Sequence, residues 1–148
     1  MKYNEKKRLQ IALRRLYATN SPSKEILTFI GIDKQGFINH VNKYFLEGMT
    51  KENFGKIWGL DHIVPVDLFD INDEAEKKLC YNYQNIIPMF NNDNRLKGAS
   101  VHFSLAKLET MYTNVYIQQL KEKCLNEITN RYDKYLFNAP RGAFQNFG

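Results

Sequence analysis

Two short apolar segments, each interrupted by a proline, stand in the middle of a chain whose other apolar residues recur mostly at helical spacing. The first, 60–68, is rich in Ile and Val and contains Pro65, and the second, 83–90, contains Pro88. Runs of this length that are bounded by turn-forming residues are typical of short strands. The acidic stretch 70–79 between them predicts a short helix. We therefore expect two strands, like the arms of a hairpin, joined by a helical excursion.

Helical patterns lie on both sides of these segments. A helix over 4–18 is predicted from its apolar positions, Leu9, Ala12, Leu13 and Leu16. A second helix is predicted from about Ser23 to a stop at Gly31, and a third begins after a cap at Asp33. Residues 101–136 predict one long helix or two. This mixture favours an α+β fold, and 148 residues of which 43% are hydrophobic suffice for one modest core.

Charge is distributed unevenly along the chain. The net charge is +5, from 21 Lys and Arg against 16 Asp and Glu. Residues 1–50 carry a net +5, residues 51–80 a net −3 and residues 81–148 a net +3. A carboxylate-rich middle between two basic segments suits a protein that holds a cation next to a polyanion. Nucleic acid is the first candidate for that polyanion. Surface acids on a connecting loop would give the same pattern.

Cysteine and hydropathy patterns exclude several classes. Cys80 and Cys124 form no CxxC pair, so a four-cysteine zinc site within one chain is excluded and free thiols are expected. Cys80 is expected to be a core residue. No apolar stretch reaches the roughly 18 residues that suggest a membrane helix, and no apolar segment follows the charged start. We therefore expect neither a membrane span nor a secretory signal.

A group of residues suited to phosphodiester hydrolysis lies in and after the two apolar segments. Asp61 and His62 precede the first proline, Asn85 precedes the second, and Asn94 follows nine residues after Asn85. A near-neutral histidine can take a proton from water. Carboxylate and amide oxygens are ligands for a hard divalent cation, which neutralises charge on phosphate. Adjacent side chains on a strand point to opposite faces, so Asp61 and His62 can serve one substrate only at a distorted strand end.

Three segments in a fixed order resemble a known family. They are 58–65 (WGLDHIVP), 82–89 (NYQNIIPM) and 92–98 (NDNRLKG), and 48–55 precedes them as a lead-in. Together they resemble an HNH endonuclease, closest to the phage-type branch, over roughly residues 25–100. The resemblance implies an α+β fold with a ββα-metal (His-Me finger) nuclease core and flanking helices.

The resemblance also implies a role for each residue of the group. Asp61 and Asn94 would hold Mg²⁺ or Mn²⁺, His62 would be the general base, and Asn85 would form hydrogen bonds across the two arms and orient His62. Relatives often carry a histidine where this chain has Gly59, and Asn94 stands where the last histidine of the motif usually stands. An amide ligand favours a hard cation over a softer one. No structural zinc is expected, because the CxxC pairs that brace many HNH proteins are absent from the sequence.

Basic side chains in two parts of the sequence are candidate DNA contacts. Arg95 and Lys97 follow Asn94 and could hold neighbouring phosphates. The N-terminal cluster could grip the DNA backbone without reading sequence, or could be an ordinary solvated helix face; it consists of Lys6, Lys7, Arg8, Arg14 and Arg15.

Other polar and aromatic residues have simpler expected roles. His40 and His102 are expected at the surface or in packing. Three acids could be further metal ligands, but loop solvation is favoured for them: Asp67, Asp70 and Asp73. Four tyrosines could stack on unpaired bases, but their helical spacing favours core packing: Tyr112, Tyr116, Tyr132 and Tyr135.

These observations predict a basic helical arm over 1–50, the nuclease core over 51–100, and helices over 101–148 that end in a mobile or docked tail. The predicted function is metal-dependent hydrolysis of DNA phosphodiester bonds, with nicking expected from a single active site per chain. The alternatives are a DNA-binding or virion-associated module that keeps the fold without cleaving, and an RNA-directed nuclease. The expected location is the cytoplasm, that of the host cell if a phage encodes the chain.

Overall fold

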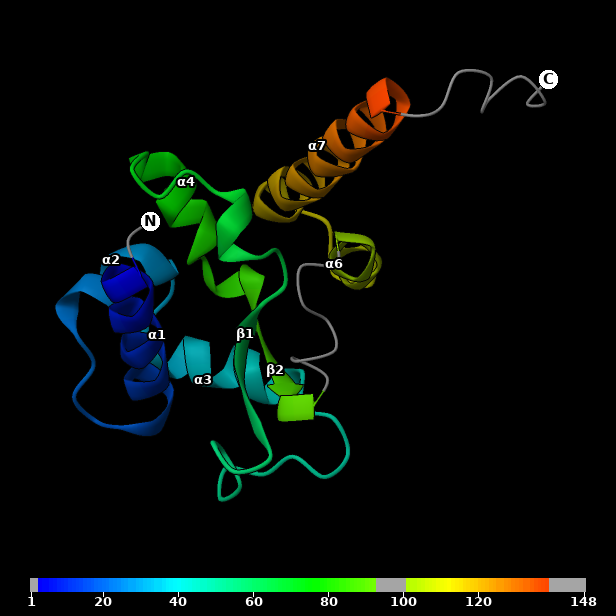
Figure 1. Ribbon diagram of the computed structural model, residues 1–148. Helices are drawn as coiled ribbons and strands as arrows, with labels where there is room; N and C mark the ends of the chain where they lie inside the picture. Colours follow the sequence, from blue (N-terminus) through cyan, green and yellow to red (C-terminus); the bar gives the residue numbers. More distant parts are fainter. Residues whose placement is uncertain (1–2, 93–100, 139–148) are drawn as a thin grey trace.

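The computed structural model describes the backbone of residues 3–92 and 101–138, and the side chains of residues 5–92 and 101–132. Short helices surround a pair of strands (Figure 1). In chain order the elements are α1 (Tyr3–Ala18), α2 (Lys24–Ile30), α3 (Lys34–Lys43), β1 (Trp58–His62), the 3-10 turn η1 (Val66–Leu68), α4 (Glu74–Cys80), the 3-10 turn η2 (Tyr83–Asn85), β2 (Ile86–Phe90), α6 (Val101–Glu109) and α7 (Val115–Asn138). The predicted α+β class is confirmed.

Strands β1 and β2 pair in antiparallel fashion, with Trp58 opposite Phe90 and His62 opposite Ile86. The first strand is displaced from the predicted range 60–68. It begins at Trp58 and ends at His62, because the chain then turns through Pro65, which cannot donate to a strand ladder. Within the described residues the sheet has two strands, so β2 is an edge strand and tolerates Pro88.

The predicted start and end of α2 and the predicted start of α3 are confirmed, whereas α3 ends at Lys43, before the predicted stop at 47–50. The Ser23 side chain accepts from the amide of Ile26 at the start of α2, and Asp33 accepts from Gly36 at the start of α3. Gly31 ends α2 with φ +75°, a conformation that side-chain-bearing residues rarely adopt.

Local capping also explains the later helices. Asp73 caps α4 by accepting from the Glu76 amide, which places the predicted acidic helix at Glu74–Cys80. The range 101–136 contains two helices rather than one. The break falls before Asn114, whose side chain accepts from the Ile117 amide at the start of α7.

The N-terminal helices pack on one another and on the strand pair. In Figure 1, α1 and α2 lie to the left of the strands and α6 to the right. The apolar positions predicted to face inward from α1 are all buried: Leu9, Ala12, Leu13 and Leu16. Helices α2 and α3 contact α1, and α3 also contacts β2. Burial of apolar area between these elements is the main stabilising contribution to the fold.

Trp58 anchors the loop between α3 and β1 to the core. Its side chain is fully buried, and its indole Nε1 donates to the Thr50 carbonyl over 2.7 Å. The rings of Tyr17, Phe45 and Phe54 lie around it at centroid distances of 5.4, 5.0 and 4.8 Å. Edge-to-face contacts of this kind stabilise aromatic clusters beyond their buried area. Burial raises the pKa of Tyr17 to about 12, so its hydroxyl stays protonated.

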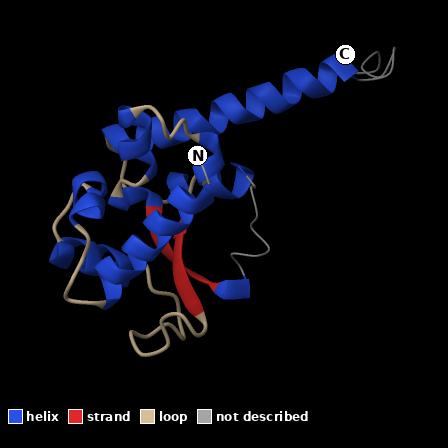
Figure 2. Ribbon diagram, turned by 60° about the vertical axis from the view of Figure 1, so that its left-hand side comes forward, coloured by secondary structure: helices blue, strands red, loops and turns tan. Residues whose placement is uncertain are grey.

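Helix α7 leaves the body of the protein and projects away from it in both ribbon views (Figures 1 and 2). Its inward positions Ile117, Leu120 and Cys124 are buried, whereas Leu125 is 50% exposed. No helix within the described ranges is long and apolar enough to cross a membrane.

The packing role expected for the C-terminal tyrosines is wrong for three of them. Tyr112 lies in the turn before α7 and is 89% exposed. Tyr116 and Tyr132 are 47% and 56% exposed, because the buried stripe of α7 runs through Ile, Leu and Cys instead. The Tyr135 side chain lies outside the described residues.

Replacement of Trp58 by alanine is expected to lower the free energy of unfolding by about 4 kcal/mol, since it deletes a fully buried aromatic side chain. Urea denaturation followed by far-UV circular dichroism measures this loss. Tyr132→Ala, which removes an exposed aromatic ring, is the matched control and should stay within about 0.5 kcal/mol of the unmodified chain. Equal losses in the two variants would contradict the central position of Trp58.

Candidate functional site

Three of the predicted site residues meet at one end of the strand pair. Asp61 and His62 are the last residues of β1, and Asn85 directly precedes β2. The side chains of β1 alternate as expected: His62 is buried on the same face as Leu60, whereas Asp61 is half-buried on the other face.

The Asn85 side chain joins the two arms. It is fully buried and accepts from the Val64 amide over 2.8 Å. Its Nδ2 donates to the carbonyls of Val64 and Cys80 over 3.2 and 2.9 Å. The Asn85 backbone carbonyl accepts from the Ile63 amide over 2.8 Å. These hydrogen bonds hold the chain that follows His62 against the start of β2 and the end of α4. They are the contacts that a positioning role would use, and the catalytic part of that role stays a prediction.

The His62 ring is buried in the body of the protein. It is 4% exposed and packs edge to face on Tyr81, with ring centroids 5.0 Å apart and planes at 88°. Burial raises the pKa of the Tyr81 phenol, which therefore stays neutral beside the imidazole.

Two further side chains hold the backbone around His62. Ser104, buried on α6, donates from Oγ to the Ile63 carbonyl over 2.5 Å. Gln10 of α1 donates from Nε2 to the Leu60 carbonyl over 3.1 Å. Sequence reasoning missed both. They lie 41 and 50 residues from their partners, so no local pattern could have indicated them.

The remaining predicted ligand, Asn94, and the predicted phosphate contacts Arg95 and Lys97 lie outside the described residues. Within the described side chains, no group of three or more His, Cys, Asp or Glu could hold a metal ion. The predicted Mg²⁺ ligands, Asp61 and Asn94, are one carboxylate and one amide and would not form such a group. Their role as metal ligands therefore stays a prediction.

The three acids considered as extra ligands have local roles in the structure. Asp73 caps α4, Asp70 accepts from the Asn72 amide, and Asp67 pairs with Lys6 at 3.5 Å. These contacts agree with the favoured interpretation of these acids as loop residues.

The other histidines have no place in the predicted site. His40 packs beside β2, and its Nε2 lies 2.7 Å from the Ile86 carbonyl. Burial lowers the pKa of His40, so the neutral ring that donates this hydrogen bond is favoured near pH 7. His102 is exposed on α6. Cys80 is a core residue, as expected, and burial raises the pKa of its thiol.

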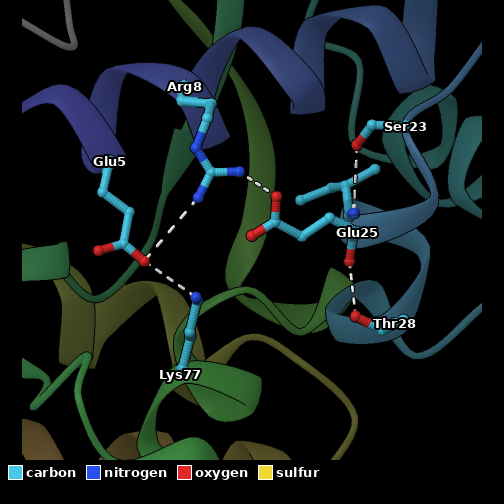
Figure 3. Close-up of polar contacts among 7 residues, drawn as sticks. Glu5, Arg8, Ser23, Glu25, Thr28 and Lys77 are labelled. Atoms are coloured by element: carbon cyan, nitrogen blue, oxygen red, sulfur yellow. Dashed lines mark hydrogen bonds and ion pairs between the residues drawn. The ribbon is translucent and has the colours of Figure 1, made fainter.

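The basic cluster on α1 is partly occupied by internal ion pairs (Figure 3). Arg8 forms a charge-assisted hydrogen bond with Glu25 of α2, and its second terminal nitrogen lies 4.0 Å from Glu5. Lys77 of α4 donates to Glu5 over 3.0 Å. The hydrogen bond between Arg8 and Glu25 raises the pKa of the guanidinium and lowers the pKa of the carboxyl. Arg8 therefore ties α1 to α2, a contact that competes with binding to DNA.

The other members of the cluster differ in their surroundings. Arg15 donates to the Ser21 carbonyl over 3.3 Å, and Lys6 pairs with Asp67 as described. Lys7 and Arg14 are exposed. Lys7 and Arg14 are thus the members of the cluster that the structure leaves best placed to meet a polyanion.

Two curated proteins of Acanthamoeba polyphaga mimivirus are similar to this chain. "Uncharacterized protein L426" is 30% identical over 101 residues, which cover 68% of this chain and 44% of that protein. "Uncharacterized protein L246" is 28% identical over 121 residues, which cover 78% of this chain and 52% of that protein. The chain thus spans about half the length of the curated relatives that it matches. No family profile matches the chain, and no solved structure matches it.

Replacement of Asn85 by alanine is expected to lower the free energy of unfolding by about 3 kcal/mol, because it leaves buried backbone groups of Val64 and Cys80 without their partner. Asn91→Ala is the matched control, since Asn91 is exposed and donates one hydrogen bond to the Lys56 carbonyl. Chemical denaturation compares the two. A loss no larger than that of the control would contradict the bridging role.

Asn85→Asp should make stability depend on pH. The introduced carboxyl can still accept from Val64, but its charged form would face two carbonyls in a buried site, which raises its folded-state pKa above the unfolded value of about 3.9. The deficit relative to the unmodified chain should therefore be smallest near pH 4 and grow as the pH rises through the folded-state pKa. Denaturation at pH 4, 5.5 and 7 tests this, and a deficit independent of pH would contradict it.

Proposed function

We propose that the chain is a metal-dependent endonuclease that hydrolyses DNA phosphodiester bonds, with a ββα-metal core of the HNH type over residues 51–100. The observation that carries the proposal is the end of the strand pair, where Asp61 and His62 end β1 on opposite faces, Asn85 precedes β2 and the Asn85 side chain spans both arms. A buried amide that bonds to the backbone two residues after His62 suits a site whose base must be held in one position.

Each residue then has one role. His62 accepts a proton from the attacking water on an imidazole nitrogen. Asn85 positions the strand end that carries His62. Asp61 and Asn94 would hold Mg²⁺ or Mn²⁺, and the half-buried carboxylate of Asp61 is a suitable oxygen donor for such a cation. The cation, when bound, supplies charge neutralisation at the phosphate and at the leaving 3′ oxygen.

DNA is the proposed partner because the chain carries basic side chains that can meet phosphates. Lys7 and Arg14 are exposed on α1, and Arg95 and Lys97 follow Asn94 in the sequence. Contacts from such side chains position a duplex without reading its sequence. One active site per chain favours nicking by a monomer, and we place the activity in the cytoplasm of the cell that makes the protein.

A supercoiled-plasmid assay tests the proposal. Mg²⁺ or Mn²⁺ should support conversion to the nicked form, and EDTA should stop it. His62→Ala should slow cleavage by about 100-fold or more, the usual contribution of a general base. His102→Ala is the matched control, since it removes an exposed histidine from α6, and it should cleave normally. Asp61→Asn and Asn94→Ala should each raise the Mg²⁺ concentration required for half-maximal rate.

Four outcomes would overturn parts of the proposal. Equal cleavage by His62→Ala and His102→Ala would remove His62 as the base. No cleavage by the unmodified chain, together with tight and salt-sensitive DNA binding, would favour the non-cleaving module. Faster cleavage of RNA than of DNA of the same sequence would reassign the substrate. Linear product that appears before nicked product, with a dimer in sedimentation, would replace nicking by double-strand cleavage.

A further inference from the structure

A second polar and aromatic site lies on the opposite side of β2 from β1. It is an open pocket of about 150 Å³ between the end of α3, the turn η2 and the segment that joins α6 to α7. Its lining includes Lys43, Tyr44, Tyr83, Gln84, Tyr112 and Asn114, and we call it the tyrosine pocket. Pockets that enclose drug-sized ligands are larger, roughly 300–1,000 Å³, so this one suits a single planar ring system.

Tyr112 is the most solvent-exposed large apolar side chain among those that line the pocket. It is 89% exposed, in the turn between α6 and α7, although the neighbouring Met111 is buried. The walls of the pocket are aromatic as well: the His40 ring lies 5.1 Å from Tyr44 and 5.0 Å from Tyr83. An aromatic ring held open at the mouth of an aromatic-walled pocket is the arrangement on which bases of unpaired nucleic acid stack.

Two lysines give the pocket its charge. The ammonium groups of Lys43 and Lys107 lie 5.8 and 5.6 Å from the centroid of the Tyr44 ring. Within the described side chains, no carboxylate forms an ion pair with either lysine. The two ammonium groups lie close to the Tyr44 ring, so this ring holds positive charge at the pocket. The exposed ring of Tyr112 is the one that offers a face for stacking.

An amide pair completes the pocket. Asn114 donates from Nδ2 to Oε1 of Gln84 over 2.5 Å, which links the start of α7 to η2. Gln84 is buried and the Asn114 oxygen already accepts from the Ile117 amide, so this pair holds one wall of the pocket in place. The pocket thus offers a stacking face and a positive charge, which match the base and the phosphate of one nucleotide.

The tyrosine pocket is connected to the candidate site through β2. His40, which lines the pocket, bonds to the Ile86 carbonyl, and Ile86 is the strand partner of His62. Paired strands lie about 4.8 Å apart, so the pocket and the end of β1 flank the same short length of β2. A nucleotide in the pocket would belong to a strand that passes the candidate site.

From this arrangement we propose that the tyrosine pocket binds an unpaired nucleotide of a DNA strand. The proposal deepens the proposed function, since it names single-stranded or branched DNA as the substrate class, and it depends on that function only for what happens at His62. Binding itself needs no cleavage and no metal.

Fluorescence anisotropy in EDTA tests it, with a labelled 12-nucleotide oligo(dT) and a labelled duplex of the same length. Tyr112→Ala should weaken oligo(dT) binding by about 5- to 100-fold, the usual effect of removing one aromatic ring on which a base stacks, and should change duplex binding by less than twofold. Tyr112→Phe should retain affinity. Lys43→Gln should weaken binding and reduce the slope of log affinity against log salt by about 0.7 for each phosphate that the lysine no longer neutralises.

Tyr132→Ala is the matched control, because Tyr132 is an exposed tyrosine in the C-terminal half of α7. Equal effects of Tyr112→Ala and Tyr132→Ala on oligo(dT), or equal effects of Tyr112→Ala on oligo(dT) and duplex, would overturn the proposal. Displacement of oligo(dT) by equimolar dTMP would show a free nucleotide rather than a strand as the ligand, and would overturn it too. The anisotropy assay contains no metal, so it measures binding without cleavage. If His62→Ala loses plasmid cleavage but retains oligo(dT) binding, the binding proposal is separated from the proposed nuclease activity.

Discussion

The Asn85 side chain is the contact on which the centre of this protein depends. A buried amide is tolerated only when its hydrogen bonds are made, and here the bonds reach backbone groups of two other segments, at Val64 and at Cys80. Those bonds decide where β1 stops, where β2 starts and where α4 ends. Apolar burial alone would permit these segments to slide, whereas hydrogen bonds to named backbone groups allow one arrangement.

Charge on α1 has a structural use as well as a proposed binding use. Arg8 pairs with Glu25 of α2, and Glu5 pairs with Lys77 of α4. Part of the charge on α1 therefore forms ion pairs within the protein. The number of basic side chains in the first fifty residues therefore overstates the positive surface that a polyanion would meet. The remaining positive charge includes Lys7 and Arg14, which are exposed on α1, and the two lysines beside Tyr44.

Strand β2 connects the two sites discussed above. The first residue of β2, Ile86, pairs with His62 of β1. The carbonyl of Ile86 accepts a hydrogen bond from His40, which lines the tyrosine pocket. If both sites bind DNA as proposed, a strand held at Tyr112 would be aligned beside Asp61 and His62 by the same short strand. Such sharing of one rigid element holds two contacts at a constant separation, which favours substrates in which an unpaired nucleotide lies next to the scissile bond.

Local chemistry made part of this structure predictable. Ser23, Asp33 and Gly31 act through residues within a few positions, so the ends of α2 and the start of α3 followed from the sequence, as did the buried face of α1. The family resemblance of the three segments implied two antiparallel strands carrying Asp61, His62 and Asn85, and in the structure these residues lie at one end of the strand pair. The outward Tyr112, the pairing of Arg8 with Glu25 and the support from Ser104 did not follow from the sequence, because each depends on which distant element lies opposite. Helical periodicity states that a face is apolar, but only the packed fold decides which face is covered.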